Sequence, residues 1–395
     1  NDGDKTAVVI VCDLLGIYNN QAREWAAQIA EKVGLDAQSV IVCHTHTHTG
    51  PVVCGAREPS DPMYDEWLFR RLCDAATMAV RDLKNVTSVS GYEGDCKGVT
   101  FVRRFKMKGG YYQTWANWLD PDIEDYAGLN DESLRFVRIA REGGEELVLI
   151  NFQTHPDNVS TDMYSADFPG FLRNYMEEAK PGIKSIFFNG TEGQMVAIDW
   201  WYGTGRSEKY VKAKEVARSL ADFVLEHYSE VKPLEGDGVK FGQTVKMCKT
   251  KWSAEKRDEL MTEAERLIYI HEHGNEVEEI GPDWIATPLI AEAYQMRRLD
   301  AGKLAEVPMM VSAVTIGGLA FVGLPGEPFN EIGKHIRDNS PFPMTFVMCQ
   351  ANGCEGYYPT AEAYDQGGYE PRNTRFPRGI GEILMETGVE LIKSL

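Results

Sequence analysis

The sequence lacks the features that mark membrane-spanning and nucleic-acid-binding proteins. No apolar run approaches the ~20 residues needed to cross a bilayer, so we expect no transmembrane segment. Basic residues are scarce, with 41 Lys and Arg against 60 Asp and Glu, which gives a formal net charge of -19. Because phosphate contacts need clustered Lys and Arg, this charge argues against a nucleic-acid or anionic-membrane partner.

Cysteine pairs and linkers are also missing. The eight cysteines form no Cys-x-x-Cys pair, which argues against a disulfide scaffold and a cysteine zinc finger. There is no repeat and no linker rich in Pro or Ser. The polar start, Asn1 to Asp4, holds no signal peptide and leaves the compartment open. What is present, 395 residues with 43% hydrophobic and 26% charged, is an ordinary globular composition.

The hydrophobic pattern predicts an α/β fold. Thr6–Cys12 and Ser39–Cys43 are typical of buried strands, and Gln21–Val33 between them has helical spacing. Such strand–helix–strand units form parallel sheets. We therefore expect one domain over residues 1–395, with a mixed, largely parallel sheet flanked by helices and β-hairpin additions. One hairpin is predicted to turn at Gly317 and Gly318, and Val99–Phe105 is a further predicted strand. A subdomain joint is suggested near residues 235–250.

Three of the eight histidines, His44, His46 and His48, alternate directly after the second predicted strand. On an extended chain such side chains point the same way, about 7 Å apart. Imidazole binds zinc and also transfers protons near neutral pH. Ligands bind beyond the carboxyl ends of strands in open α/β sheets. The run therefore predicts a metal or catalytic site, with an accidental polar strand end as the alternative.

Further strand-like runs also end in polar residues. The predicted strand Glu146–Phe152 leads to His155, and Leu319–Leu324 leads to Glu327 between a glycine and a proline. Phe346–Cys349 leads to the loop that holds Tyr357. A hydrogen bond to the backbone is the alternative role for His155. A favourable charge at a helix N-terminus is the alternative for Glu327. Because four such runs end in candidate ligands or proton-transfer groups, a shared site is the better interpretation.

Six segments resemble the motifs of one enzyme family, in the same order along the chain. They are Cys12–Gly16, His46–Pro51, Asn151–His155, Ser165–Gly170, Gly323–Pro328 and Gly356–Thr360. On these residues the chain resembles the catalytic domain of the neutral/alkaline, non-lysosomal ceramidases, which are zinc-dependent amidases. The resemblance extends from residue 7 to about residue 382.

The resemblance implies Zn²⁺ as a cofactor, held by His46, His155, Glu327 and Tyr357. It assigns His48 as the imidazole that moves protons. Asp167 would orient His155 or cap the following helix, and we group it with His48 as catalytic. His44 would support the ligands from behind. The family also slightly favours a periplasmic or secreted location.

The chain departs from the family after the predicted strand Ile183–Phe188, which follows the second histidine motif. The family carries Gly-Asp-Val-Ser-Pro, with the serine beside the zinc. If Gly193 aligns with the glycine, Gln194 replaces Asp and Val196 replaces Ser. Valine has no proton to donate, so we expect a substrate other than ceramide. After Tyr369 the sequence predicts one helix rather than the family's immunoglobulin-like domain.

Several residues near these motifs are candidates for substrate binding. Trp200 and Trp201 have faces that stack on sugars or line lipid grooves, with core packing as the alternative. Arg104 and Arg375 carry guanidinium groups that suit carboxylates, with an exposed basic loop as the alternative. Gln194, which replaces the family's Asp, is grouped with them.

The sequence therefore predicts a zinc-dependent hydrolase that cleaves an amide (N-acyl) bond with metal-activated water. The substrate would be a small molecule or derived from an oligosaccharide or lipid. One alternative is a carbohydrate-active lyase, esterase or deacetylase acting on an acidic or N-acylated sugar. Another is an inactive, ligand-binding relative. The oligomeric state stays open.

Overall fold

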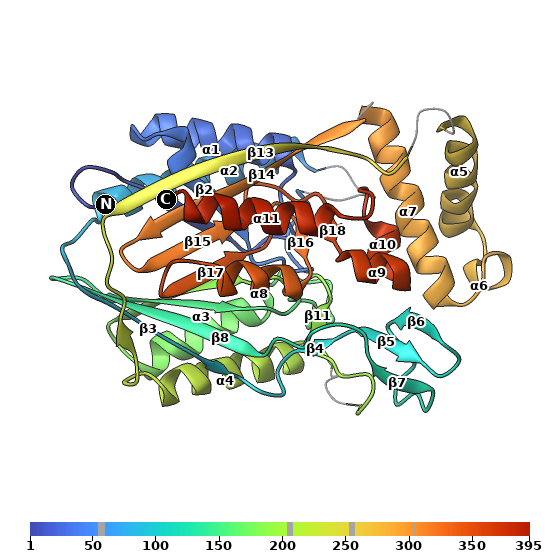
Figure 1. The fold of residues 1–395 in the computed structure, drawn as a ribbon, viewed down its shortest axis with the longest axis horizontal. Coiled ribbons are helices and arrows are strands. Elements are labelled where there is room, and N and C mark those ends of the chain that lie inside the picture. Colours follow the sequence, from blue (N-terminus) through green and yellow to red (C-terminus); the bar gives the residue numbers. More distant parts are fainter. Residues whose placement is uncertain (54–59, 204–207, 253–256, 303–304) are drawn as a thin grey trace.

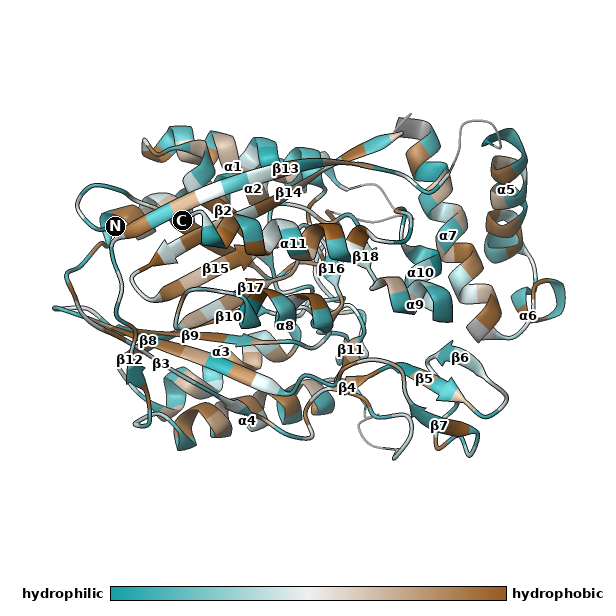
Figure 2. Ribbon diagram, in the orientation of Figure 1, coloured by the Kyte–Doolittle hydropathy of each residue, from teal (hydrophilic) through white to brown (hydrophobic). Residues whose placement is uncertain are grey.

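The computed structural model describes residues 1–53, 60–203, 208–252, 257–302 and 305–395. Two β-sheets pack face to face, and helices cover the outer face of each (Figure 1). The expected mixed α/β architecture is confirmed. Figure 2 shows strongly hydrophobic strands in the middle of the molecule, whereas the surrounding helices carry both hydrophilic and hydrophobic turns.

The first sheet has the strand order β10-β9-β8-β3-β12. Its strands are Ile183–Asn189 (β10), Glu146–Phe152 (β9), Ser133–Arg141 (β8), Val86–Asp95 (β3) and Lys232–Pro233 (β12). β10 and β9 are parallel, and the other neighbouring pairs are antiparallel. Along β9, Val148 and Ile150 face the helices while Leu149 faces the second sheet, as the two-residue period of a strand requires.

The second sheet has the order β13-β14-β15-β17. Its strands are Val239–Lys249 (β13), Glu306–Ile316 (β14), Leu319–Gly323 (β15) and Met344–Met348 (β17). The predicted hairpin at Gly317 and Gly318 joins β14 to β15, and β15 is parallel to β17. β13 occupies the suggested joint near residues 235–250 and pairs with β14 along its whole length. The division into domains stays a prediction.

Four apolar clusters hold these layers together. One lies between the two sheets and includes Phe188, Phe321 and Phe346. Helices α3 (Asp167–Ala179) and α4 (Val211–Glu226) cover the first sheet, and α8 (Asn330–Asp338) and α11 (Ile380–Lys393) cover the second. The parallel pair β1 (Val8–Cys12) and β2 (Val40–His44) packs under α1 (Asn19–Val33) and α2 (Pro62–Arg81). The strand ends are thereby fixed in a rigid frame.

The remaining elements lie around this frame. A three-stranded sheet combines Arg104–Met107 (β5), Tyr111–Thr114 (β6) and Ile123–Tyr126 (β7). Short pairs join Phe101–Val102 (β4) to Met195–Val196 (β11) and Glu327–Pro328 (β16) to Tyr357–Tyr358 (β18). The other helices are Ala37–Ser39 (a 3-10 turn), Arg257–His273 (α5), Glu276–Glu279 (α6), Asp283–Gly302 (α7), Ala361–Gln366 (α9) and Tyr369–Asn373 (α10). In the described part of the chain, no helix has the length and apolarity to cross a membrane.

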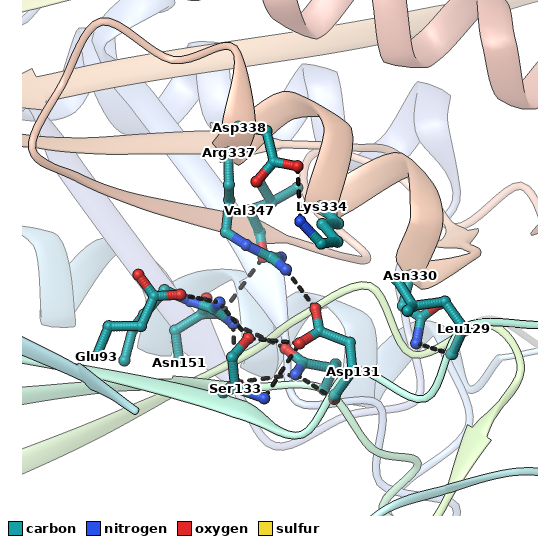
Figure 3. Close-up of polar contacts among 12 residues, drawn as sticks. Glu93, Leu129, Asp131, Ser133, Asn151, Asn330, Lys334, Arg337, Asp338 and Val347 are labelled. Carbon is teal, nitrogen blue, oxygen red and sulfur yellow. Dashed lines mark hydrogen bonds and ion pairs between the residues drawn. The ribbon is translucent and has the colours of Figure 1, made fainter. Parts of the chain in front are cut away.

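A buried polar network ties the first sheet to helix α8. Arg337 of α8 forms an ion pair with Asp131, and Asn330 donates to the Leu129 carbonyl at 2.6 Å (Figure 3). Arg135 on β8 is fully buried and donates to Asn151. Because an unpaired buried charge is costly, these contacts fix α8 against the sheet.

Antiparallel pairing is more extensive than the strand–helix–strand pattern predicted. Val86–Asp95 was not predicted as a strand, because one side of it is exposed and polar. Val99–Phe105 was predicted as one strand, but it divides at Arg103 into β4 and β5. The Arg103 amide donates to the Gln194 carbonyl, and its own carbonyl accepts from Trp115. This pairing redirects the chain into the small sheet.

Candidate metal centre

The carboxyl ends of strands from both sheets and from the β1–β2 pair meet at one place. The Asn189 side chain at the end of β10 donates to the Thr45 carbonyl after β2, at 3.0 Å. The Cys349 amide after β17 donates to the Asn189 carbonyl at 3.1 Å. The Gln350 amide donates to the Gly326 carbonyl after β15, at 2.9 Å. These bonds hold the polar loops against one another.

Three predicted ligands converge at this point. The Glu327 Oε2 atom lies 3.4 Å from His46 Nε2 and 3.3 Å from His155 Nε2. Ligands bound tetrahedrally at 2.0–2.1 Å from zinc are separated by roughly 3.3–3.4 Å. All three side chains are nearly excluded from solvent. Their spacing therefore fits a divalent cation placed between them.

Backbone carbonyls orient both imidazole rings. His46 Nδ1 lies 2.8 Å from the Leu15 carbonyl, and His155 Nδ1 lies 2.9 Å from the Met195 carbonyl. A ring that donates from Nδ1 keeps a lone pair on Nε2, which is the usual arrangement of metal-binding histidines. His46 Nε2 is buried without a hydrogen-bond partner among the described residues. His46 has a φ of 67°, so the chain turns here rather than continuing as a strand.

A fourth buried group, Glu192, completes the cluster. One ligand atom from each of His46, His155, Glu192 and Glu327 lies within 4.8 Å of all the others. Glu192 is fully buried, and neither of its carboxylate oxygens has a hydrogen-bond partner in the described structure. The sequence interpretation did not single it out. The signal was a carboxylate three residues beyond the strand that ends at Asn189, the same pattern that identified His155 and Glu327.

The charges of the cluster are strongly coupled. Burial lowers the pKa of His46, but the Glu327 carboxylate outweighs it and raises that pKa to about 9. Burial raises the pKa of Glu327, but His46 and His155 hold it well below its usual range. Burial raises the pKa of Glu192 to about 8 against the opposing effect of His46. Without a metal ion these shifts leave a neutral Glu192 beside the ion pair of His46 and Glu327 at pH 7.

His48 stands on the open side of the cluster. Its ring centre lies 5.0 Å from that of His46 and 5.8 Å from that of His155, and about a third of its side chain is exposed. Its Nδ1 atom is 3.9 Å from the Asp157 carboxylate. Three imidazoles, His46, His48 and His155, form a second possible metal-binding group. His48 is thus placed between the cluster and solvent, where a proton carrier is needed.

His44 does not join this group. We expected the chain to stay extended through His48, with three imidazoles on one side, but β2 ends at His44 and the chain turns at His46. His44 Nδ1 lies 2.7 Å from the Gln350 carbonyl, and its Nε2 atom is buried without a partner in the described residues. Burial lowers the pKa of His44 to about 4, so the ring is neutral at pH 7. His44 thus contacts the backbone of Gln350, whose side-chain nitrogen lies 3.1 Å from His46 Nδ1.

Tyr357 is next to Glu327 because β16 and β18 pair in parallel with these two residues in register. The tyrosine is buried and interacts with the Arg103 guanidinium, which lies 5.5 Å from the ring centre. Burial and the Glu327 charge raise its pKa well above the usual range. The phenol therefore adjoins the cluster, although Arg103 is its close polar partner.

Arg104 is directed away from the cluster, in contrast to its neighbour Arg103. Arg104 is buried and donates to Glu370 at 3.0 Å and to Gln366 at 3.1 Å. Arg103 donates to the other Glu370 oxygen at 2.9 Å and to the Gly193 carbonyl at 2.9 Å. A substrate carboxylate would have to displace these bonds. Both arginines thus act as buried supports in this structure.

Asp167 supports His155 indirectly. Its carboxylate accepts from the Asn158 amide at 2.7 Å, and the Asn158 side chain donates to the His155 carbonyl at 3.1 Å. The His155 ring itself is oriented by Met195. Burial raises the pKa of Asp167 to about 6. Asp167 is the first residue of helix α3 and accepts from the Phe168 amide, whereas the N-cap residue Ala166 makes no side-chain cap bond.

The other substrate-binding candidates contact the protein itself. Trp200 is buried in the apolar cluster under the small sheet, and the partly buried Trp201 packs at its edge against Tyr126 and Tyr202. The Gln194 side chain bonds to Asn330 and Glu331. Arg375 is buried and pairs with Glu355. Of these residues Trp201 retains partial exposure, and core packing accounts for the others.

Solved structures of neutral ceramidases have the same fold. A neutral ceramidase from Pseudomonas aeruginosa superposes with a TM-score of 0.65 at 15% identity, covering 98% of this chain and 66% of that one. A structure described as a ceramidase complexed with C2 gives a TM-score of 0.67, 15% identity and coverage of 98% and 67%. No protein-family model and no curated protein matches the sequence. The chain thus resembles the neutral ceramidases in fold and spans about two thirds of their length.

Proposed function

We propose that the protein is a zinc-dependent hydrolase that cleaves an amide bond of an N-acylated compound other than ceramide. The observation that carries this proposal is the spacing of the His46, His155 and Glu327 ligand atoms, which suits a tetrahedrally bound cation. The neutral ceramidase fold supports the reaction class. When bound, zinc supplies a water of lowered pKa and polarises the scissile carbonyl.

The protein's own groups provide orientation and proton transfer. Leu15 and Met195 hold the two ligand imidazoles with their Nε2 atoms turned to the cluster. His48 receives and returns the proton on the solvent side, where its Nδ1 atom lies 3.9 Å from the Asp157 carboxylate. Burial and the His46 charge lower the pKa of His48 to about 3, so the ring is neutral at pH 7 before it accepts a proton. Val196 stands where the ceramidases have serine, so the reaction here depends on His48 for proton transfer.

Metal analysis of two ligand variants tests the proposal. We expect purified His46→Ala and His155→Ala proteins to lose most of their zinc, while His273→Ala, which alters an exposed histidine on α5, keeps it. Full zinc occupancy in both ligand variants would reject the site. His48→Ala should retain zinc and lose about 10²–10⁴-fold in kcat, the range for general acid–base groups. Release of free amine from N-acyl amino alcohols and N-acyl sugars provides the activity measurement.

The carbohydrate-active alternative has less support. It depended on Trp200, Trp201 and arginines as a sugar-binding surface. Trp200 is buried, and Arg104 and Arg375 are buried in ion pairs, so Trp201 alone of these residues keeps partial exposure. An inactive relative would bind ligand without turnover even when zinc is present. Turnover of any N-acyl substrate by the zinc-loaded protein would therefore exclude the inactive relative and support the hydrolase.

A further inference from the structure

Glu192 is a buried carboxylate to which the proposed function has so far given no role. It is fully buried, and both of its carboxylate oxygens lack hydrogen-bond partners among the described residues. The neighbouring Cys349 thiol, which interacts with it, is only a weak donor. Buried carboxylates are normally paired or bound to a metal. Glu192 therefore needs a partner that the protein's own side chains do not supply.

The backbone around Glu192 is held tightly against the strand that carries Glu327. The Gly193 amide donates to the Pro328 carbonyl at 3.0 Å. A Cβ atom at Gly193 would lie 2.6 Å from the Glu327 carbonyl oxygen, so only glycine permits this approach. The Arg103 side chain fixes the Gly193 carbonyl from the other side. These contacts hold the backbone segments of Glu192 and Glu327 together, and both carboxylates are buried.

Two adjacent buried carboxylates are not both ionised unless a cation lies between them. The nearby guanidinium of Arg103 already donates to Glu370 and to the Gly193 carbonyl and interacts with Tyr357. The ligand atoms of Glu192, Glu327 and the two histidines lie within 4.8 Å of one another. Two carboxylates also balance the charge of one divalent ion. The same ion that accounts for Glu327 would therefore account for Glu192.

We infer that Glu192 is a direct ligand of the metal ion, which is then held by two imidazoles and two carboxylates. This inference rests on the proposed metal site and adds a ligand that the motif resemblance does not include. This second carboxylate is fully buried, whereas about a third of the His48 side chain is exposed. It thus tightens binding of the ion and leaves the solvent side for water and substrate.

Metal affinity and a cobalt spectrum test this inference without relying on activity. We would compare wild-type protein, Glu192→Gln and Glu362→Gln, each stripped of metal and titrated with zinc against a chromophoric chelator. We expect Glu192→Gln to bind zinc at least about 10- to 100-fold more weakly. The visible absorption of the Co²⁺-loaded variant should also change, because a ligand atom is lost. Glu362→Gln makes the same substitution at an exposed position on α9 and should match wild type in both measurements.

An unchanged zinc affinity and cobalt spectrum in Glu192→Gln would overturn the inference. If His155→Ala loses zinc in the same experiment, the proposed site survives that result. If His155→Ala also keeps zinc, the proposed function fails as well. Should Glu192→Gln not fold, as judged by circular dichroism, Glu192→Asp replaces it. Its shorter side chain should weaken zinc binding and shift the spectrum, and wild-type values would again overturn the inference.

Discussion

Replacing Gly193 by alanine should disturb the metal centre through the backbone. The added Cβ would lie 2.6 Å from the Glu327 carbonyl oxygen and 3.0 Å from that of Pro328. Ordinary contacts begin at 3.4 Å, so β16 must move away by about 0.8 Å. Both neighbours are backbone atoms of a paired strand, so no flexible side chain can absorb the displacement.

This movement has two measurable consequences. Overpacking of this kind costs about 1–3 kcal/mol, which lowers the free energy of unfolding of the metal-free protein. Metal–ligand distances tolerate only about 0.2 Å, so Glu327 would no longer match the other ligands. We expect the dissociation constant for zinc to rise at least about tenfold, or roughly 1.4 kcal/mol. Chelator competition measures the affinity, and urea unfolding measures the stability.

Gly144→Ala is a matched control, because the nearest atoms to its Cβ would be the ends of flexible side chains at 3.4 Å. We expect wild-type zinc affinity for this variant. If Gly193→Ala also binds zinc within twofold of wild type, the close approach of β16 to the Glu192 segment is not what positions the ligands, and the reasoning fails.

Three further predictions concern stability and the thiols. Burial raises the pKa of Asp131 but Arg337 outweighs it and holds the pKa below the ordinary value, so Asp131→Asn should cost about 3 kcal/mol at pH 7. That difference should shrink as the pH falls through the lowered pKa, where wild-type Asp131 also becomes neutral. Glu370→Gln leaves two buried arginines without their carboxylate and should cost about 3–5 kcal/mol in urea unfolding. In a Cys54→Ser protein, the seven remaining thiols are buried and should react with a thiol reagent only after unfolding.

Each of these predictions has a contrary result. A stability difference for Asp131→Asn that stays constant down to acidic pH would show that its charge contributes nothing. Glu362→Gln, at an exposed position on α9, should leave the free energy of unfolding unchanged. If it lowers that free energy as much as Glu370→Gln does, the loss cannot be attributed to the buried arginines. Rapid modification of folded Cys54→Ser would contradict the burial of the other thiols.

The strands that carry the site could be predicted because their local pattern agrees with their burial. Glu146–Phe152 has the predicted limits, since its apolar residues are buried on both faces. Gly317 and Gly318 form the predicted hairpin turn. His46, His155 and Glu327 are brought together because each directly follows such a strand.

The rest depends on contacts between distant segments. Glu370 lies 267 residues from Arg103, so nothing local indicated that it would bury the arginine pair. The turn at His46 follows from its hydrogen bonds to residues of other loops, and the extended pattern of the sequence concealed it. Glu192 was not predicted because this segment was interpreted by its resemblance to the family's serine motif. In that alignment Val196 takes the place of the serine, and Glu192 has no assigned role. The rule that found His155 applies equally to Glu192 and was not extended to it.

Anomalous diffraction at the zinc absorption edge, from crystals grown with zinc, tests the central claim most directly. We predict one strong peak at roughly 2.0–2.2 Å from the Nε2 atoms of His46 and His155 and from a Glu327 carboxylate oxygen. A structure in which these side chains bond only to one another, with the anomalous peak elsewhere or absent, would contradict the account.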